Sequence, residues 1–337
     1  MTRNRRSGRP TITDVAAEAG VSAATVSRVM NGRFGGAHTV ADRVRRAAAA
    51  LQYTPSQVAR SLVLGQTKTV AFVVPDLGNP AFQDLLHRLT KAASKDGYRV
   101  LIADSGESPQ EEELLAMETR RRCDSVVLCA ARMPADVLER LAPRLHPLVL
   151  VNRPAPTPAV PSLSVDYRAG ITVLARHLYA LGHRRLAYVA GPPMSISSIE
   201  RLRGLDDFAA GAPGVVVHPV AGGSSSACGH AATEAVLASG ATAVLAFNDL
   251  VAVGLLTGLA ERGRRVPEDL SVTGFDDIPL ARYISPSLTT VSVPWQEIGV
   301  QAWARMHALI RGEDGGEDAT FRPELIVRAS SGPAPVR

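Results

Sequence analysis

The chain changes its hydrophobic pattern near residue 68. From there on, apolar runs of five to seven residues alternate with amphipathic stretches. We expect strands at residues 69–74, 98–103, 125–129, 147–151, 186–190, 214–220, 242–247 and 271–275. We expect helices between them, for example at 81–96, 109–121, 168–181, 227–239 and 249–262. Continuous apolar strands that alternate with helices are typical of parallel sheets covered on both faces, so the pattern predicts an α/β core.

Eight strands over this length favour two doubly wound parallel-sheet halves rather than one sheet. The Pro-rich stretch 153–162 is where we expect the chain to leave the first half, and a helix at 296–311 should bring it back. We therefore predict a core of residues 67–337 with two subdomains. The first takes about 67–163 and 294–322, and the second about 164–293 and 323–337.

Residues 1–54 have a different pattern, which predicts a small all-α domain. Thr11 or Thr13 can cap a first helix, Gly20 ends it, and Ser22 can cap a second helix from Ala23 to Met30. A third helix is expected from about Val40 to Leu51. A helix-turn-helix typically has a small residue where its two helices touch, a glycine in the turn and a branched apolar residue in the second helix, and this stretch has all three. Residues 23, 24, 27 and 28 should therefore face outward. The alternative is an ordinary helical hairpin.

Residues 55–66 are expected to form a short hinge between the two parts. Pro55 can begin a helix and Gly65 can end it. A helix of about two turns is marginal alone, so we expect it to form only against a partner.

The positive charge of the chain is concentrated at one end. The net charge is +5, but residues 1–60 hold ten Arg against three acidic residues, and the remainder holds 27 basic against 29 acidic residues. A basic head of +7 on a body of −2 is typical of a nucleic-acid-binding module attached to a neutral domain.

The sequence lacks the motifs that are typical of membrane proteins, secreted proteins, metalloproteins and enzymes. No apolar run approaches the roughly 18 residues of a membrane span, and the basic start has no apolar stretch behind it, so we expect a cytoplasmic protein without a membrane partner. The three cysteines lack metal-ligand spacing, and neither a phosphate-binding loop nor an HExxH motif occurs. We therefore predict no enzyme activity, no catalytic residues, no metal and no cofactor.

In several motifs along the chain, the sequence resembles the lactose/galactose repressor family of bacterial transcription regulators. The resemblance is carried by VSRVMNG (26–32), YTPSQVARSL (53–62), VAFVVPDLGNPAF (70–82), LGHRRLAYVAGPP (181–193), FNDLVAVG (247–254) and the stretch 265–291. It implies a helix-turn-helix head, a hinge helix and a core like a periplasmic binding protein. It also implies a homodimer that binds a pseudo-palindromic double-stranded DNA operator and responds to a small effector, a sugar or a sugar-like molecule.

The resemblance also assigns roles to individual residues of the head. It implies base contacts by Ala23, Ala24 and Arg28, and Arg28 is suited to a bidentate contact with guanine. Phosphate or backbone contacts are implied for Thr11, Thr13, Ser22, Thr25, Ser27 and Asn31. Leu62 stands at the position that inserts into the minor groove; its alternative role is burial against the core.

In the core, polar residues follow the predicted strands, where ligands bind in doubly wound sheets. The resemblance matches seven of these positions to effector binding: Asp76, Asn79, Phe82, Ser197, Arg201, Asn248 and Asp276. Asn248 and Asp276 could instead cap the next helix.

Departures from the family pattern occur in both parts. In the head, Gly36-Ala37 and Val40-Ala41 remove a cap and two phosphate contacts; His38, Thr39 or Arg43 are the candidates to replace them. In the core, the stretch before Gly229 lacks the aromatic residue that the family often stacks on the ligand and offers only Ser224, and Val293 replaces a polar residue.

We conclude that the sequence predicts a DNA-binding transcriptional regulator, a repressor that a small polar ligand either releases or strengthens. One alternative is a regulator with a degenerate pocket that acts through DNA alone. The other is a solute-binding protein, which would need a signal peptide and no basic head.

Overall fold

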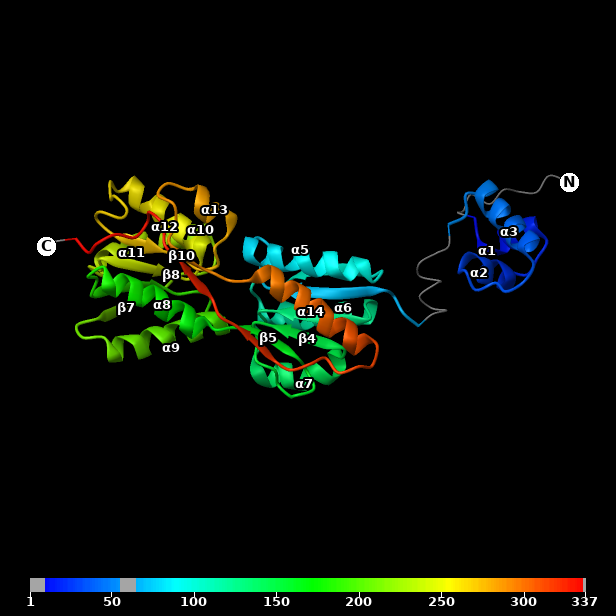
Figure 1. Cartoon of the computed structure of the whole chain (residues 1–337), viewed down its shortest axis with the longest axis horizontal. Helices are drawn as coiled ribbons and strands as arrows, with labels where there is room; N and C mark the ends of the chain where they lie inside the picture. Colours follow the sequence, from blue (N-terminus) through cyan, green and yellow to red (C-terminus); the bar gives the residue numbers. More distant parts are fainter. Residues whose placement is uncertain (1–9, 55–64, 336–337) are drawn as a thin grey trace. The chain divides into compact units, whose positions relative to one another are not determined.

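The computed structural model describes residues 10–54 and 65–335, and it divides into two compact units, Met1–Thr67 and Lys68–Arg337 (Figure 1). The expected hinge helix and Leu62 lie outside the described residues.

The first unit contains the three expected helices. They are α1 (Ile12–Ala19), α2 (Ala23–Met30) and α3 (His38–Ala50). Thr11 caps α1, and Gly20 adopts the left-handed conformation, with φ of 63°, that turns the chain toward α2. Val15, Val26 and Val44 are fully buried at the centre of the three helices, which form a core of their own. The apolar spacing of the three helices therefore closes a separate small domain.

The second unit contains two parallel sheets, each in its own lobe. The first lobe has a six-stranded sheet in the order β11 (Ala319–Phe321), β5 (Ser162–Val165), β4 (Leu148–Val151), β3 (Ser125–Cys129), β1 (Thr69–Val74) and β2 (Arg99–Asp104). The second lobe has a four-stranded sheet in the order β7 (Val216–Val220), β6 (Arg185–Val189), β8 (Ala243–Ala246) and β9 (Ser271–Thr273). A two-stranded antiparallel sheet joins β10 (Thr290–Ser292) and β12 (Glu324–Ile326).

Helices cover both faces of the first sheet. They are α5 (Pro80–Lys95), α6 (Pro109–Arg122), α7 (Ala135–Leu145) and α14 (Trp295–Ile310). Val70, Phe72 and Val74 of β1 share one apolar cluster with α5 and α14, whereas Ala71 and Val73 share another with α6 and α7. The alternation along β1 thus follows the two-residue period of a strand. Because both faces are covered, the prediction of a doubly wound sheet is confirmed.

The second lobe is built in the same way around a shorter sheet. Its helices are α8 (Tyr167–Ala180), α9 (Ile196–Gly211), α10 (Ser226–Ala231), α11 (Thr233–Ala238), α12 (Asp249–Glu261) and α13 (Pro279–Tyr283). α8 packs against α9, and α10 packs against α12. The expected single helix at 227–239 is wrong, since α10 and α11 divide it.

Two further expectations about the core need correction. The chain does not leave the first lobe at the Pro-rich stretch, because Leu163 of β5 still pairs with Val151 of β4 and with Ala319 of β11. The described residues also contain four short strands, β5, β10, β11 and β12, beyond the eight expected. The return of α14 to the first lobe is confirmed: it packs along α5, and the indole N–H of Trp303 donates to Asp96 at 2.7 Å.

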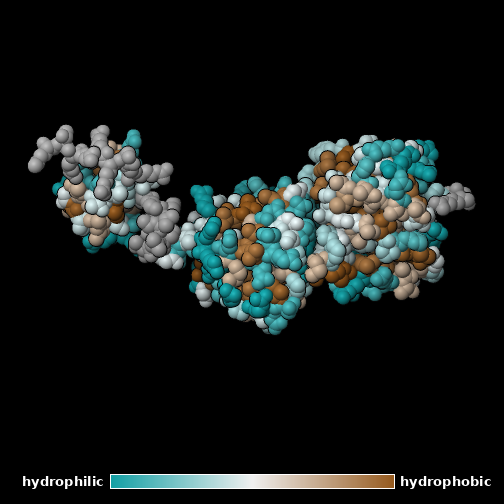
Figure 2. Space-filling model, turned by 180° about the vertical axis from the view of Figure 1, so that it is seen from behind, coloured by the Kyte–Doolittle hydropathy of each residue, from teal (hydrophilic) through white to brown (hydrophobic). Residues whose placement is uncertain are grey.

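Apolar and polar residues alternate over the visible face of both lobes (Figure 2). Within the described ranges, no helix is both long enough and apolar enough to cross a membrane.

Candidate functional site

The outer face of α2 presents the residues expected to contact DNA. Ala23, Ala24 and Arg28 are exposed, while Thr25 and Ser27 are half-buried. The Arg28 Nε donates weakly to the Ala24 carbonyl, at 3.4 Å, so only one long bond restrains this guanidinium among the contacts of the described head. The face therefore combines two methyl groups with one extended cation.

Side-chain bonds fix the ends of this helix. Ser22 accepts the N–H of Thr25 at 3.2 Å, and the hydroxyls of these two residues lie 3.0 Å apart. At the other end, Asn31 is half-buried and donates to the Ser27 hydroxyl at 3.4 Å. The exposed Thr11 and Asp14 form a reciprocal capping box on α1. These polar groups are ordered by the fold and remain near the surface.

The third helix of the head lacks such a cap, as its sequence predicts. Its N-cap is Ala37, and no side chain there accepts a backbone N–H. His38, Thr39 and Arg43 of this helix are exposed, as is Thr13 of α1.

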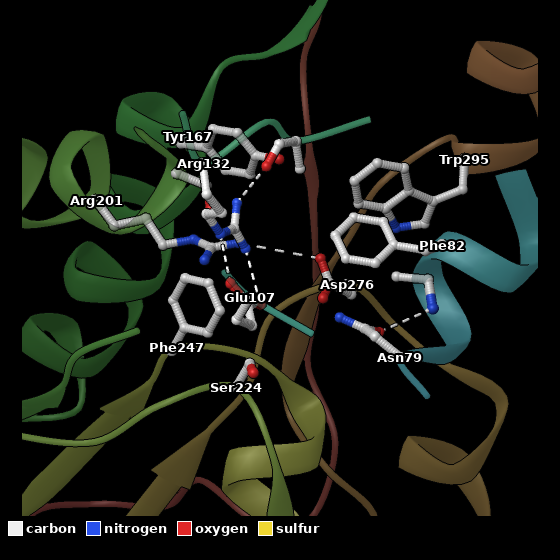
Figure 3. Close-up of a pocket in the computed structure, with 13 residues that line it drawn as sticks. Asn79, Phe82, Glu107, Arg132, Tyr167, Arg201, Ser224, Phe247, Asp276 and Trp295 are labelled. Carbon is white, nitrogen blue, oxygen red and sulfur yellow. Dashed lines mark hydrogen bonds and ion pairs between the residues drawn. The ribbon is translucent and has the colours of Figure 1, made fainter. Parts of the chain in front are cut away.

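A small cavity lies between the two lobes of the core, at the carboxyl ends of strands from both sheets (Figure 3). Its volume is about 20 Å³, which suits about one water molecule. A sugar therefore enters only if the wall rearranges. The residues that line it include Asn79, Phe82, Glu107, Arg132, Tyr167, Ser197, Arg201, Ser224, Phe247, Asp276 and Trp295.

Arg201 is the most unusual member of this wall. Its side chain is only 2% exposed, and its guanidinium carbon lies 3.8 Å from the ring centroid of Phe275, 4.6 Å from that of Phe247 and 4.7 Å from that of Tyr167. These cation–π contacts replace part of its hydration. Among the described residues, its Nε and Nη1 have no hydrogen-bond acceptor. The cavity thus contains two N–H donors that a ligand could use.

Asp276 faces this guanidinium from the second lobe. Its Oδ1 lies 4.0 Å from the Arg201 Nη2, and burial raises the pKa of its carboxyl group from 3.8 to about 7 although Arg201 acts in the opposite direction. Its backbone has a φ of 110°, a strained conformation for a residue other than glycine. Asp276 is therefore held in place at an energetic cost, as is common at ligand sites.

The strained turn at Asp276 is fixed by Asp249 on α12. The Asp249 Oδ1 accepts the Thr290 hydroxyl at 2.5 Å, and its Oδ2 accepts the Ile278 N–H at 2.8 Å. Burial raises the pKa of Asp249 well above its usual value, and the neighbouring Asp276 raises it further.

On the first lobe, Arg132 and Glu107 form a two-bond ion pair in the wall. The Nε to Oε2 distance is 2.5 Å and the Nη2 to Oε1 distance is 3.0 Å. Arg132 also donates from Nη1 to the Ala130 carbonyl at 2.5 Å. Behind it, the carboxylate of Glu112 accepts the backbone N–H groups of Arg132 and Met133.

Five predicted effector residues line the cavity, and two do not. Asn79, Phe82, Ser197, Arg201 and Asp276 are in its wall. The structure does not place Asp76 or Asn248 there. Asp76 accepts the Gly78 N–H within its own turn, at 2.8 Å. Asn248 caps α12 by accepting the Val251 N–H at 2.9 Å, and it donates to the Ser224 carbonyl, which positions the loop of Ser224.

Sequence reasoning missed several residues of the wall: Glu107, Arg132, Tyr167, Phe247 and Trp295. All five follow the end of a strand by one to three residues, which is the signal that selected the others. The strands before Tyr167 and Trp295, β5 and β10, were not among those expected from the sequence, so the signal could not be applied there.

Comparisons with known proteins agree with this geometry. Residues 11–56 match the family described as bacterial regulatory proteins, lacI family, and residues 175–331 match the periplasmic binding protein-like domain. The HTH-type transcriptional repressor CytR of Escherichia coli is 31% identical over 95% of this chain and 96% of its own length. The HTH-type transcriptional regulator AscG of the same species is 32% identical, with coverage of 95% and 98%.

Solved structures show the same architecture. The Lac repressor dimer bound to operator and an anti-inducer has a TM-score of 0.85 at 25% identity, covering 96% of this chain and all of that one. The complex of the transcriptional regulator CelR with cellobiose has a TM-score of 0.69 at 30% identity, with the same coverage. Together with the head and the two-lobed core, these matches show that the chain belongs to the lacI family of bacterial regulatory proteins.

Proposed function

We propose that the protein is a transcriptional repressor whose affinity for a DNA operator changes when a small polar ligand binds between the lobes. The observation that carries the proposal is the exposed face of α2, where Ala23, Ala24 and Arg28 lie together on a capped helix. A helix of this kind fits the major groove, where Arg can bind guanine through two hydrogen bonds and Ala can contact thymine methyl groups. Thr11, Thr13, Ser22, Thr25, Ser27 and Asn31 would hold the phosphates on either side.

The experiment is selection of bound duplexes from a random DNA pool, followed by affinity measurements on the selected duplex and on a scrambled one. Arg28→Ala should weaken binding to the selected duplex by about tenfold or more and change binding to the scrambled one far less. Arg46→Ala, which removes an exposed arginine from α3, is the matched control. Equal losses on both duplexes for Arg28→Ala would assign this residue to phosphate contact only.

We also propose that the protein acts as a homodimer in the cytoplasm. β2 is an edge strand of the first sheet and exposes Leu101 and Ile102, which are 38% and 43% exposed. An apolar edge strand is an aggregation risk unless another surface covers it. A second copy of the chain would cover it and would place two heads on a two-fold symmetric operator. Leu62 would then enter the minor groove at the operator centre.

A second candidate function is a regulator that does not respond to a ligand, and the small cavity favours it. Thermal shift against sugars, polyols and nucleosides separates the two, because a ligand that binds only the folded state raises its stability. A ligand-induced shift that Arg201→Ala abolishes would exclude the second candidate.

A further inference from the structure

The cavity is surrounded by more buried positive charge than its carboxylates neutralise by contact. Arg132, Arg153 and Arg201 are 3%, 5% and 2% exposed. Only Arg132 has a close carboxylate, that of Glu107. Arg153 donates to two main-chain carbonyls, those of Ala131 and Met133, and Arg201 approaches Asp276 no closer than 4.0 Å. Buried charges are usually paired, so this arrangement is incomplete.

The raised pKa values of two carboxyl groups, one in the wall and one behind it, increase the imbalance. Since the pKa of Asp276 is raised to about 7, this carboxyl group is only partly ionised at neutral pH. Burial also raises the pKa of Glu112, which lies behind Arg132. The negative charge available to the guanidinium groups is therefore smaller than the count of acidic residues suggests.

Unused hydrogen-bond donors point to the same deficit. In the described part of the chain, neither the Nε and Nη1 of Arg201 nor the indole Nε1 of Trp295 has an acceptor, and both side chains are at most 5% exposed. Both side chains lie in the cavity wall, on opposite lobes (Figure 3). A ligand that brings acceptors would satisfy these donors, and carboxylate and phosphate oxygens are the strongest acceptors for guanidinium.

The ion pair between Arg132 and Glu107 shows where such a group would fit. The Glu107 side chain is 23% exposed, and Glu107 lies in the turn after β2, immediately after Gly106 in the sequence. Arg132 is 4% exposed as a side chain and is tied to the Ala130 carbonyl. Glu107 can therefore move into solvent while Arg132 stays. Its departure would leave a site shaped for two oxygens beside a cavity that is otherwise too small for a ligand.

We propose that the effector carries a carboxylate or phosphate group, which replaces the Glu107 carboxylate on Arg132 and also accepts from Arg201. This inference rests on the proposed function. The hydroxyl-bearing remainder of the ligand would face Asp276. A groove of about 380 Å³ continues beyond Asp276 and is lined by Asp84 and Glu297, so the neutral end of the ligand lies toward this acidic side.

The experiment titrates the full-length protein with matched neutral and anionic probes and follows thermal shift and tryptophan fluorescence. The probes are glucose, gluconate, glucuronate and glucose 6-phosphate, together with ribose and ribose 5-phosphate. We expect at least one anionic probe to bind at least about tenfold more tightly than its neutral counterpart, since a charge-assisted hydrogen bond is worth about that factor. The acid and phosphate arms distinguish the two sources of the anion. Binding of neutral probes alone, or of no anionic probe, overturns the inference.

Two variants and a control test the assigned residues. Arg132→Met should weaken binding of the anionic probe by at least about tenfold and leave binding of neutral probes unchanged. Glu107→Gln removes the competing carboxylate, so it should bind the anionic probe as tightly as the parent protein or more tightly. Arg140→Met removes an exposed arginine on α7 and should change nothing. If Arg132→Met does not fold, Glu107→Gln is the deciding variant. Weaker binding of the anionic probe by Glu107→Gln would contradict the proposal that the ligand replaces the Glu107 carboxylate on Arg132.

The outcomes also separate this inference from the proposed function. A neutral ligand that binds in the cleft and changes DNA affinity would contradict the proposal of an anionic effector but support the proposed regulatory function. Loss of all sequence-specific DNA binding overturns the regulator, whatever the probes do.

Discussion

Asp276→Asn should stabilise the core at neutral and alkaline pH but not near pH 4. The carboxyl group of Asp276 is 7% exposed, and its pKa rises from 3.8 to about 7 because of burial. The folded state therefore holds this proton more tightly than the unfolded state does. Consequently, Asp276 lowers the free energy of unfolding as the pH rises from about 4 to about 7, with no further change above that range.

The magnitude follows from the size of the shift. A rise of about three pKa units, at 1.36 kcal/mol each, corresponds to about 4 kcal/mol between the two ends of the range. Asparagine resembles the protonated carboxyl group in shape and carries no charge. Asp276→Asn should then match the parent protein near pH 4 and exceed its stability by up to about 4 kcal/mol at pH 8.

Urea unfolding followed by tryptophan fluorescence measures this effect on the core alone. Both tryptophans of the chain, Trp295 and Trp303, lie in the second unit. The urea midpoints of the two proteins should coincide near pH 4 and separate progressively up to pH 7, with an unchanged slope. Asp269→Asn is the control, because hydrogen bonds from Arg265 lower the pKa of this half-buried carboxyl group, so the variant should not gain stability at high pH. A constant difference at all pH values would refute the reasoning.

Three further changes test other parts of the account. Arg201→Ala should abolish any ligand-induced thermal shift while ligand-free operator binding stays intact, because Arg201 lies in the core cavity; a folded variant that no longer binds DNA contradicts this placement. Asn248→Ala should lower the stability of the core by about 1 kcal/mol, the usual effect of losing a helix cap, and an unchanged urea midpoint would show that the cap is unimportant. Leu62→Ala should weaken operator binding and reduce DNA bending with little change in the salt dependence, because no phosphate contact is lost; unchanged bending and affinity would make Leu62 a packing residue.

The elements that the sequence predicted are those with a strong local signal. The runs of β1 and β3 are continuous and apolar, and the caps Thr11 and Ser22 stand immediately before their helices. β11 and β12 have only three residues each, and they form because strands far away in the sequence offer them partners. No local pattern contains that information.

The cavity was predictable only in part, for a related reason. Polar residues after strands were the right class, yet Asp76 and Asn248 bond to their own turns while Arg132 reaches into the cavity. Each of these residues follows a strand at a similar spacing. Asn79 also accepts an N–H of its own turn and still lines the cavity, so the position of each side chain depends on the path of the folded loop rather than on residue type or spacing.

The central claim is that a ligand between the lobes controls DNA binding by the head. The most direct test measures the dissociation constant of the selected duplex for the full-length protein, with and without a saturating amount of a probe that raises its melting temperature. We expect this dissociation constant to change by at least about fivefold, as is typical of two coupled sites. Arg201→Ala should remove this change. The same dissociation constant with and without the bound probe would contradict the account.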